Sequence, residues 1–163
     1  MKRNQGFTLI ELIIVIVILG ILAVTAAPKF LDFGSDAKKS TLTGVKGALE
    51  SASALVYGKA IIEGVHKEET GALTNPIVDL TYGYPAADID VIRAVTELAV
   101  AEWDITKGSG EGAGTDDIVI SPTGSTLATD AGKGCHVVYK AATATGTPPV
   151  ISKPVITVYA GGC

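Results

Sequence analysis

The pattern of apolar and polar positions begins with a long apolar run. From Phe7 to Ala27 the side chains are apolar almost without interruption, and Glu11 is the only charged residue among them. About 20 apolar residues is the length needed to cross about 30 Å of hydrocarbon. The run therefore predicts a membrane-spanning helix over 7–27, and the basic residues Lys2 and Arg3 favour a cytoplasmic amino terminus.

Beyond the apolar run the pattern becomes amphipathic and predicts that the helix continues to about Lys59. Apolar residues recur at spacings of three and four, at Leu42, Val45, Leu49, Ala52 and Val56. Lysines and glutamates occupy many of the positions between them. We therefore expect this half of the helix to bury one face and to wet the other.

Residues 60–163 predict a small α+β head. Pro85 is suited to the first turn of a short helix, whose apolar side would comprise Ile89, Ile92, Val95 and Ala99. Three segments rich in β-branched residues and bounded by Gly or Pro predict strands, namely 117–121, 135–141 and 150–161. Pro154 marks an edge or a bulge in the last of them. The expected product is an antiparallel sheet packed on the amphipathic half of the long helix.

Glu11 is the residue of the apolar run that needs a physical explanation. An ionised side chain in lipid costs about 2.5 to 3.5 kcal/mol on the insertion scale, so it is a functional residue by default. No Lys or Arg occurs between Arg3 and Lys29, and the helix therefore supplies no cation to neutralise it. One candidate is an α-amino group, created if the chain is cut just before Phe7.

The stretch GFTLIELIIVIVILGILAV behind a short basic leader resembles the class III signal and first helix of type IV pilins and the related pseudopilins. The resemblance implies a pilin fold with a leader at 1–6, an amino-terminal helix at 7–59 and a globular head at 60–163. It also implies that a prepilin peptidase cuts after Gly6 and methylates Phe7.

The same resemblance gives roles to three further residues of the helix. Glu11 would meet the amino-terminal amine of a neighbouring subunit, so that two buried charges cancel only when subunits dock in one stagger. Gly20 and Pro28 would be points at which the helix can lose helicity in the fibre. The expected partners are further copies of the chain, joined through their amino-terminal helices, and the pilus assembly machinery.

Two stretches, 26–49 and 83–95, are similar to the subgroup of major pilins that forms the mannose-sensitive haemagglutinin (MSHA) pilus. They favour an adhesion fibre, stored as a precursor in the inner membrane and then assembled on the cell surface, with a host or surface glycan as receptor. Two alternatives stay open. One is the major pseudopilin of a type II secretion system, and the other is a soluble exported binding protein whose apolar start is a cleaved signal peptide.

Cys135 and Cys163 are the two cysteines, and neither belongs to a CxxC or a His-containing metal spacing. A disulfide needs an oxidising compartment, so an exported chain would join the two cysteines. The resemblance to pilins implies a disulfide-bounded carboxy-terminal region, whose surface touches neighbours or receptors. A clasp without any binding role is the equal alternative.

Composition and charge narrow the classes of function. The formal charge is −4, and without Lys2 and Arg3 there would be 11 basic residues against 17 acidic ones. An acidic chain lacks the basic patch that binds nucleic-acid backbones, so no nucleic-acid partner is expected. His66 and His136 fall in no ligand or catalytic spacing, and we therefore predict no enzyme and no cofactor. Trp103 is interpreted as a core residue.

One cluster of carboxylates offers a candidate calcium site. A glycine-rich loop carries Asp104, Glu111, Asp116 and Asp117, whose oxygens are ligands that calcium accepts, and major pseudopilins use a carboxylate-rich loop in this way. The spacing does not fit an EF-hand. A flexible exposed loop is the competing interpretation.

Overall fold

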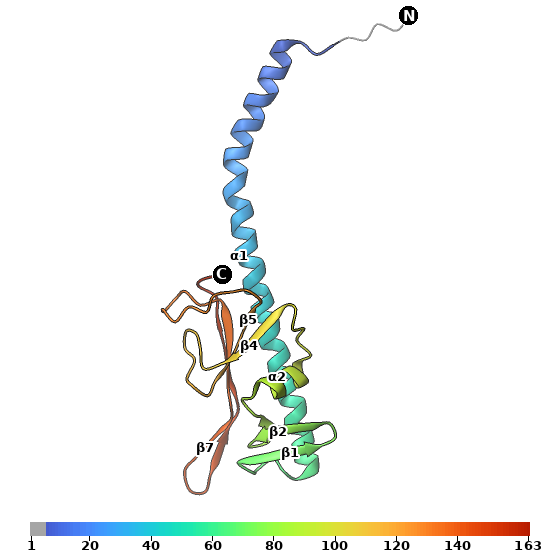
Figure 1. Ribbon diagram of the computed structural model, residues 1–163, viewed down its shortest axis with the longest axis vertical. Coiled ribbons are helices and arrows are strands. Elements are labelled where there is room, and N and C mark those ends of the chain that lie inside the picture. The colour runs from blue at the N-terminus through green and yellow to red at the C-terminus, as the bar shows by residue number, and fades with distance from the viewer. Residues whose placement is uncertain (1–5) are drawn as a thin grey trace, which may run out of the picture. The chain divides into compact units, whose positions relative to one another are not determined.

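The computed structural model describes residues 6–163, and for residues 26–32 it describes the backbone alone. The leader predicted at 1–6 therefore lies outside the described residues except for Gly6. The chain divides into two compact units, residues 1–37 and 38–163. The predicted α+β class is confirmed, because one long helix and three small antiparallel sheets make up the structure (Figure 1).

The long helix α1 spans Leu9–Glu63 and runs through Gly20 and Pro28. It starts two residues later than expected and ends four residues later. Its end is set by Gly64, whose φ of 81° is a left-handed conformation that glycine adopts without a Cβ clash. The next residue then folds back, with Val65 N donating to Ala60 O at 3.0 Å.

The first part of α1 carries its apolar side chains on every side. Each large apolar residue from Phe7 to Val24 is at least 47% exposed. A helix that is apolar all round is a buried or membrane helix rather than a surface one. Within the part of the chain that the structure describes, no helix meets the combined length and hydropathy of a membrane span.

The second unit contains nine strands and one short helix. A three-stranded sheet has the order β1-β2-β3, and the strands span Thr70–Thr74, Ile77–Thr81 and Tyr84–Pro85. The short helix α2 spans Ile89–Thr96. A four-stranded sheet has the order β4-β5-β6-β9, with bounds Trp103–Lys107, Ile118–Pro122, His136–Lys140 and Val155–Tyr159. The small hairpin β7-β8 spans Thr143–Thr145 and Val150–Ser152.

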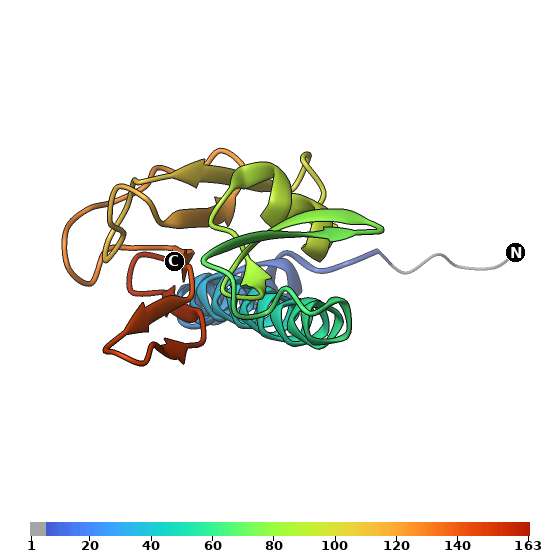
Figure 2. The same cartoon turned by 90° about the horizontal axis from the view of Figure 1, so that it is seen from below.

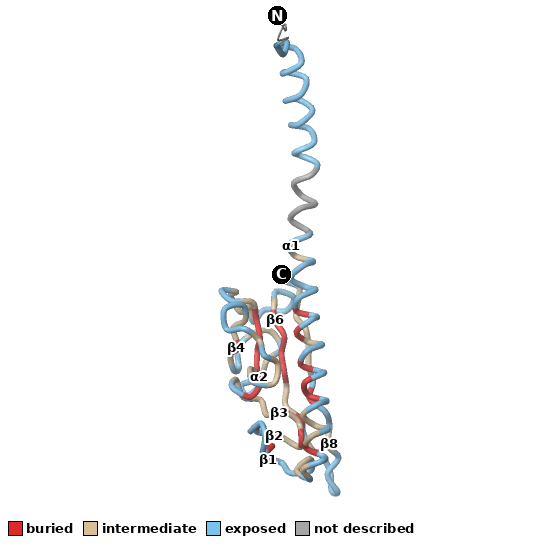
Figure 3. The backbone as a smooth tube through the Cα atoms, turned by 90° about the vertical axis from the view of Figure 1, so that its right-hand side faces the viewer, coloured by how far each residue is buried: buried red, intermediate tan, exposed pale blue. Residues whose placement is uncertain are grey.

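The core of the second unit lies between α1 and the four-stranded sheet. The predicted apolar stripe of α1 is the buried one, since Leu42, Val45 and Leu49 are at most 5% exposed. They share one cluster with Ile118 and Tyr139 of the sheet. Figure 2 shows the strands and α2 gathered on one side of the teal part of α1, and Figure 3 shows buried stretches in α1 and in β6. The expected packing of an antiparallel sheet on the amphipathic half is therefore confirmed.

The start of α2 corrects one detail of the sequence analysis. Pro85 does not open the helix but ends β3, and the helix begins at Ile89 because Asp88 is its N-cap. The Asp88 carboxylate accepts hydrogen bonds from Asp90 N at 2.9 Å and Val91 N at 3.4 Å. The expected apolar position Ala99 lies beyond the helix end.

The last predicted strand is interrupted at Pro154, and of the two expected placements the structure shows the edge and not the bulge, because β9 is the edge strand of its sheet. Lys140 pairs with Val155, and Thr143 pairs with Ser152, so β6-β9 and β7-β8 continue one register. Proline has no N–H to donate to the ladder, and the strand is interrupted there between β8, which pairs with β7, and β9, which pairs with β6. Strands β1, β2, β3, β4 and β7 were not predicted from the sequence.

Candidate functional site: the amino-terminal cap and the carboxy-terminal clasp

The amino-terminal cap is built from Thr8 and Glu11, at the point where α1 begins. Thr8 N and Thr8 Oγ1 both donate to Oε2 of Glu11, at 2.8 and 2.7 Å. Glu11 N donates in return to Thr8 Oγ1 at 3.4 Å. A threonine N-cap with a glutamate three residues later, bonded to each other in this way, is a capping box.

The capping box gives Glu11 a partner that the sequence analysis missed. The expected partner is a cation, whereas the carboxylate accepts its hydrogen bonds from the backbone and hydroxyl of Thr8. The signal is present in the sequence, because TLIE directly before an apolar run is the S/T-x-x-E signature of a helix start.

The predicted cleavage position, between Gly6 and Phe7, lies just outside this cap. Gly6, Phe7 and Thr8 are not helical, and the Phe7 side chain is 92% exposed. The peptide bond between Gly6 and Phe7 is therefore accessible in a non-helical segment. The capping box fixes the first helical residue at Leu9, the third residue after that bond.

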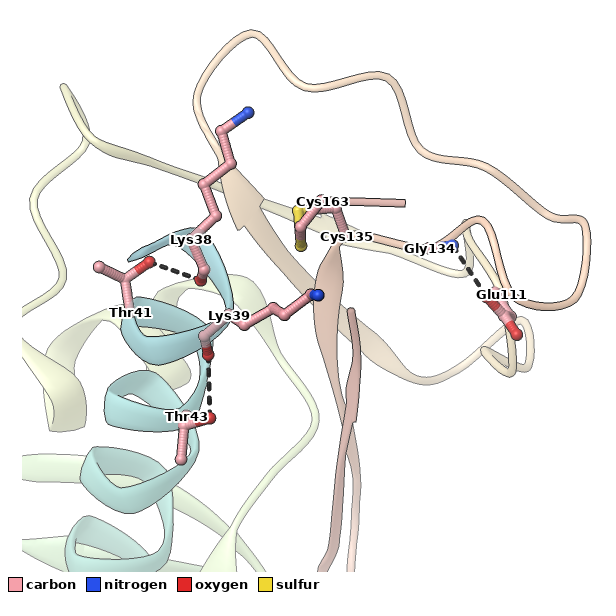
Figure 4. Close-up of a disulfide and its surroundings, with 8 residues drawn as sticks. All are labelled: Lys38, Lys39, Thr41, Thr43, Glu111, Gly134, Cys135 and Cys163. Atoms are coloured by element: carbon pink, nitrogen blue, oxygen red, sulfur yellow. Dashed lines mark hydrogen bonds between the residues drawn. A yellow bond between two sulfur atoms is a disulfide. The ribbon is translucent and has the colours of Figure 1, made fainter. Parts of the chain in front are cut away.

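The carboxy-terminal clasp begins with the disulfide between Cys135 and Cys163, which confirms the predicted pairing. Cys135 precedes β6, and Cys163 is the last residue of the chain. The two segments are also joined by a main-chain hydrogen bond from Gly162 N to Gly134 O at 3.0 Å. Figure 4 shows the disulfide close to Gly134, whose amide is bonded to Glu111.

Glu111 uses all of its polar groups to hold the segment before β6. Oε1 accepts from Gly132 N at 2.7 Å, and Oε2 accepts from Gly134 N at 2.9 Å. Its main-chain N–H donates to Ala128 O at 2.8 Å, and its main-chain oxygen lies 3.0 Å from His136 Nε2. Glu111 thus ties the loop between β4 and β5 to the loop between β5 and β6.

The two amide donors also set the ionisation of this carboxylate. Hydrogen bonds from the Gly132 and Gly134 amides lower the pKa of Glu111 against the opposing effect of burial, and the neighbouring His136 adds a smaller lowering. The amides favour the charged form because they donate to it. The carboxylate therefore stays ionised to a lower pH than an ordinary glutamate.

His136 is a packing residue of the clasp. Its ring is fully buried and stacks on Tyr159 with centroids 5.3 Å apart. Because a carbonyl oxygen only accepts, Nε2 carries the proton that it donates to Glu111. The other ring nitrogen, Nδ1, is buried without a hydrogen-bond partner among the described residues.

The glycines of GSGEGAG serve close packing at this clasp. Gly112 has a φ of 74°, and a Cβ there would coincide with the Tyr159 hydroxyl. A Cβ on Gly110, which has a φ of 116°, would lie 3.0 Å from the His136 ring. The loop can therefore approach the sheet only with glycine at these positions.

The four carboxylates of the candidate calcium site are not brought together. Asp104 accepts from Gly124 N at 3.1 Å, and Glu111 is occupied by the clasp. Asp116 lies 3.8 Å from the Lys107 ammonium, and Asp117 is 2.6 Å from that of Lys140. In the described part of the chain, no group of three or more His, Cys, Asp or Glu residues could hold a metal ion.

A groove of about 570 Å³ lies between α1 and the junction of β8 and β9. Tyr57 and Tyr84 line it and stack on each other with centroids 4.4 Å apart. Glu50 lines it from α1, and Lys153 lines it from the loop between β8 and β9. The sequence analysis did not point to these residues, because they come from three segments far apart in the chain.

Comparison with protein families places the known similarity at the amino terminus. Residues 1–27 match the prokaryotic N-terminal methylation motif. This segment includes the predicted cut after Gly6, the predicted methylation at Phe7, and Glu11. The match covers the cap but not the clasp.

Known proteins similar to this chain are pilus subunits. The chain is 39% identical over 72 residues to a fimbrial protein of Pseudomonas aeruginosa, which covers 43% of this chain and 47% of that protein. It is 47% identical over 58 residues to the type IV narrow pilus major component of Thermus thermophilus, covering 36% and 50%. Against the type IV major alpha-pilin of Moraxella bovis it is 47% identical over 64 residues, covering 39% and 38%. The chain spans about half the length of the first two relatives, and no solved structure matches it.

Proposed function

We propose that this chain is the precursor of a major pilin, the structural subunit of a type IV pilus. A prepilin peptidase would cut it after Gly6 and methylate Phe7. The apolar start of α1 would hold the precursor in the inner membrane and then pack against the same helix of other copies in a surface fibre. The match to the methylation motif and the three pilin relatives support this proposal.

The observation that carries the proposal is the all-round exposure of the first part of α1. Apolar side chains that are at least 47% exposed from Phe7 to Val24 would each gain on the order of 1 kcal/mol or more on burial of that remaining surface. Such a helix is stable only in lipid or against other apolar helices. A subunit that moves from a membrane into a helical fibre satisfies both conditions.

The capping box suggests how Glu11 takes part in this assembly. The cap holds the carboxylate on the amino-terminal side of the first turn, next to the position where cleavage would create a charged amine. An amine of the same or of a neighbouring subunit could then neutralise the carboxylate without a change in the helix. We propose that this pairing sets the stagger between subunits.

The intact mass and amino-terminal sequence of protein sheared from the cell surface test the proposal. A chain that starts at N-methylated Phe7 is expected. A chain that starts near Pro28 would overturn the proposal and favour the exported binding protein with a cleaved signal peptide. A correctly processed chain that is missing from long fibres, and whose deletion traps secreted enzymes in the periplasm, would favour the pseudopilin.

We further propose that the fibre serves attachment. This finer proposal rests on the similarity of 26–49 and 83–95 to the MSHA pilins. Its test compares the binding of piliated cells and of cells lacking this chain to glycan-coated surfaces, with soluble glycans as competitors. Equal binding by the two kinds of cell would contradict a role in attachment.

A further inference from the structure

We propose that Glu111 is a positioning residue for the disulfide, which brings Cys135 and Cys163 together before they are oxidised. The proposal concerns how the head closes and does not depend on the assembly of fibres. It starts from the place of the two hydrogen-bonded amides in the sequence, because Gly134 N belongs to the residue directly before Cys135.

The segment that ends in Cys135 is held without the disulfide. Glu111 binds it at Gly132 N, at Gly134 N and at Ala128 O, and the main-chain oxygen of Glu111 accepts from His136. These contacts bracket Cys135 on both sides in the sequence. They fix the direction in which its side chain leaves the backbone.

The segment that ends in Cys163 is held against the first one. Gly162 N donates to Gly134 O, so one residue, Gly134, is bonded to both Glu111 and the last turn of the chain. A Cβ on Gly161 or Gly162 would run into the backbone of Gly132 or Lys133. The two backbone segments therefore lie in direct contact, and Glu111 holds the segment 132–134 in place.

A preorganised pair of thiols has a high effective concentration. In exchange with oxidised glutathione, one cysteine thiolate attacks the glutathione disulfide and releases one glutathione thiolate. The second cysteine then attacks the mixed disulfide and releases the other, so that two protein thiols are oxidised and one glutathione disulfide is reduced. The second step is intramolecular, and its equilibrium depends on how well the chain holds the two sulfurs together.

The experiment measures the effective concentration of the two thiols in glutathione buffers, using the full chain in detergent. Glu111→Gln replaces one acceptor oxygen by an NH₂ group, which cannot accept from a glycine amide. Because hydrogen bonds to a charged acceptor are the stronger kind, we expect an effective concentration about tenfold lower than that of the unaltered chain. Glu102→Gln, at an exposed position before β4, is the matched control and should leave the value unchanged. An unchanged value for Glu111→Gln would overturn the proposal.

A second measurement does not depend on the folding of the Glu111 variant. In the chain with Cys135→Ser and Cys163→Ser, the proposal expects the Gly132 and Gly134 amides to stay protected from hydrogen exchange. If the two amides lose their protection when the cysteines are replaced, the disulfide holds this turn, and the hydrogen bonds to Glu111 form only as a result of it. That result would also overturn the proposal.

Discussion

The capping box at the start of α1 allows the two roles of Glu11 to be separated by substitution. Thr8→Ala removes the hydroxyl that donates to Glu11 Oε2 at 2.7 Å, and it leaves the negative charge in place. Glu11→Gln removes the charge but keeps a side-chain oxygen that can accept from Thr8 N, since glutamine also serves in capping boxes. Thr8→Ser keeps the hydroxyl and is the matched control.

The size of the effect follows from the bonds that each variant loses. Replacing a threonine N-cap by alanine costs about 0.5 to 2 kcal/mol. The bond from Glu11 N is long at 3.4 Å, and the bond from Thr8 N to Glu11 remains, so a cost of about 0.5 to 1 kcal/mol, at the low end of that range, applies. We therefore expect the first turn to open about two to five times more often in Thr8→Ala.

Amide hydrogen exchange on the full chain in detergent micelles measures this opening. The amides of Glu11 and Leu12 should exchange about two to five times faster in Thr8→Ala, and at nearly the original rate in Thr8→Ser and Glu11→Gln. Equal rates in Thr8→Ala and the unaltered chain would refute the capping box. Electron microscopy of cells that carry the same variants then tests whether fibre assembly needs the negative charge of Glu11.

The number of fibres per cell should depend on the charge of Glu11 and not on the hydrogen bonds of the capping box. We expect few or no fibres with Glu11→Gln, as with Glu11→Val, and fibres in useful number with Thr8→Ala. Abundant normal fibres with Glu11→Gln would refute the pairing with an amine. Loss of fibres in Thr8→Ala alone would show that the helix start, and not the charge, controls assembly.

Four further predictions concern the head. Gly112→Ala should lower the free energy of unfolding by about 1 to 3 kcal/mol more than Gly124→Ala in urea melts, because both have positive φ but Gly112 alone faces Tyr159. Tyr139→Phe should cost about 1 to 3 kcal/mol in the same melts, since it leaves a main-chain carbonyl, now bonded at 2.6 Å, without a partner. Reduction of the disulfide, with its sequence separation of 28, should lower the calorimetric stability by about 3 to 4 kcal/mol. Folding lowers the pKa of Glu111, so its ionised carboxylate stabilises the head above the unfolded value of about 4.5, and this stabilisation is lost as the pH falls through the folded value. In a plot of the free energy of unfolding against pH, Glu111→Gln should therefore reduce the slope at acid pH.

Local patterns account for the parts of the fold that the sequence predicted. The stripe Leu42, Val45 and Leu49 needs only the helical period, and all three residues are buried as expected. Strands β5, β6 and β9 have β-branched runs that are hard to mistake. The pattern that predicts each of these elements lies within the element itself and does not depend on the strands or helices that pack against it.

Some of the missed features depend on tertiary neighbours. β1 is TGALT, which is poor in β-branched residues, and it exists through its pairing with β2. The helix start at Asp88 was assigned to Pro85, because proline and aspartate are both favourable there and only the turn from β3 decides between them. In both cases a neighbouring strand overrides the local preference.

Glu11 and Glu111 show that the candidate sites, too, can be predicted only where the interacting residues are close in sequence. Both are glutamates whose carboxylates accept hydrogen bonds from main-chain amides. The donor to Glu11 is three residues away, so the four-letter pattern TLIE contains the signal, although the prediction from the sequence was a cation instead. The donors to Glu111 are 21 and 23 residues away, across two loops whose glycines let the backbones approach. The sequence analysis grouped Glu111 with three other carboxylates as calcium ligands because chemical type was the one property that the sequence displayed. Its bonds to two amides give this carboxylate an anchoring role in the head that needs no metal ion.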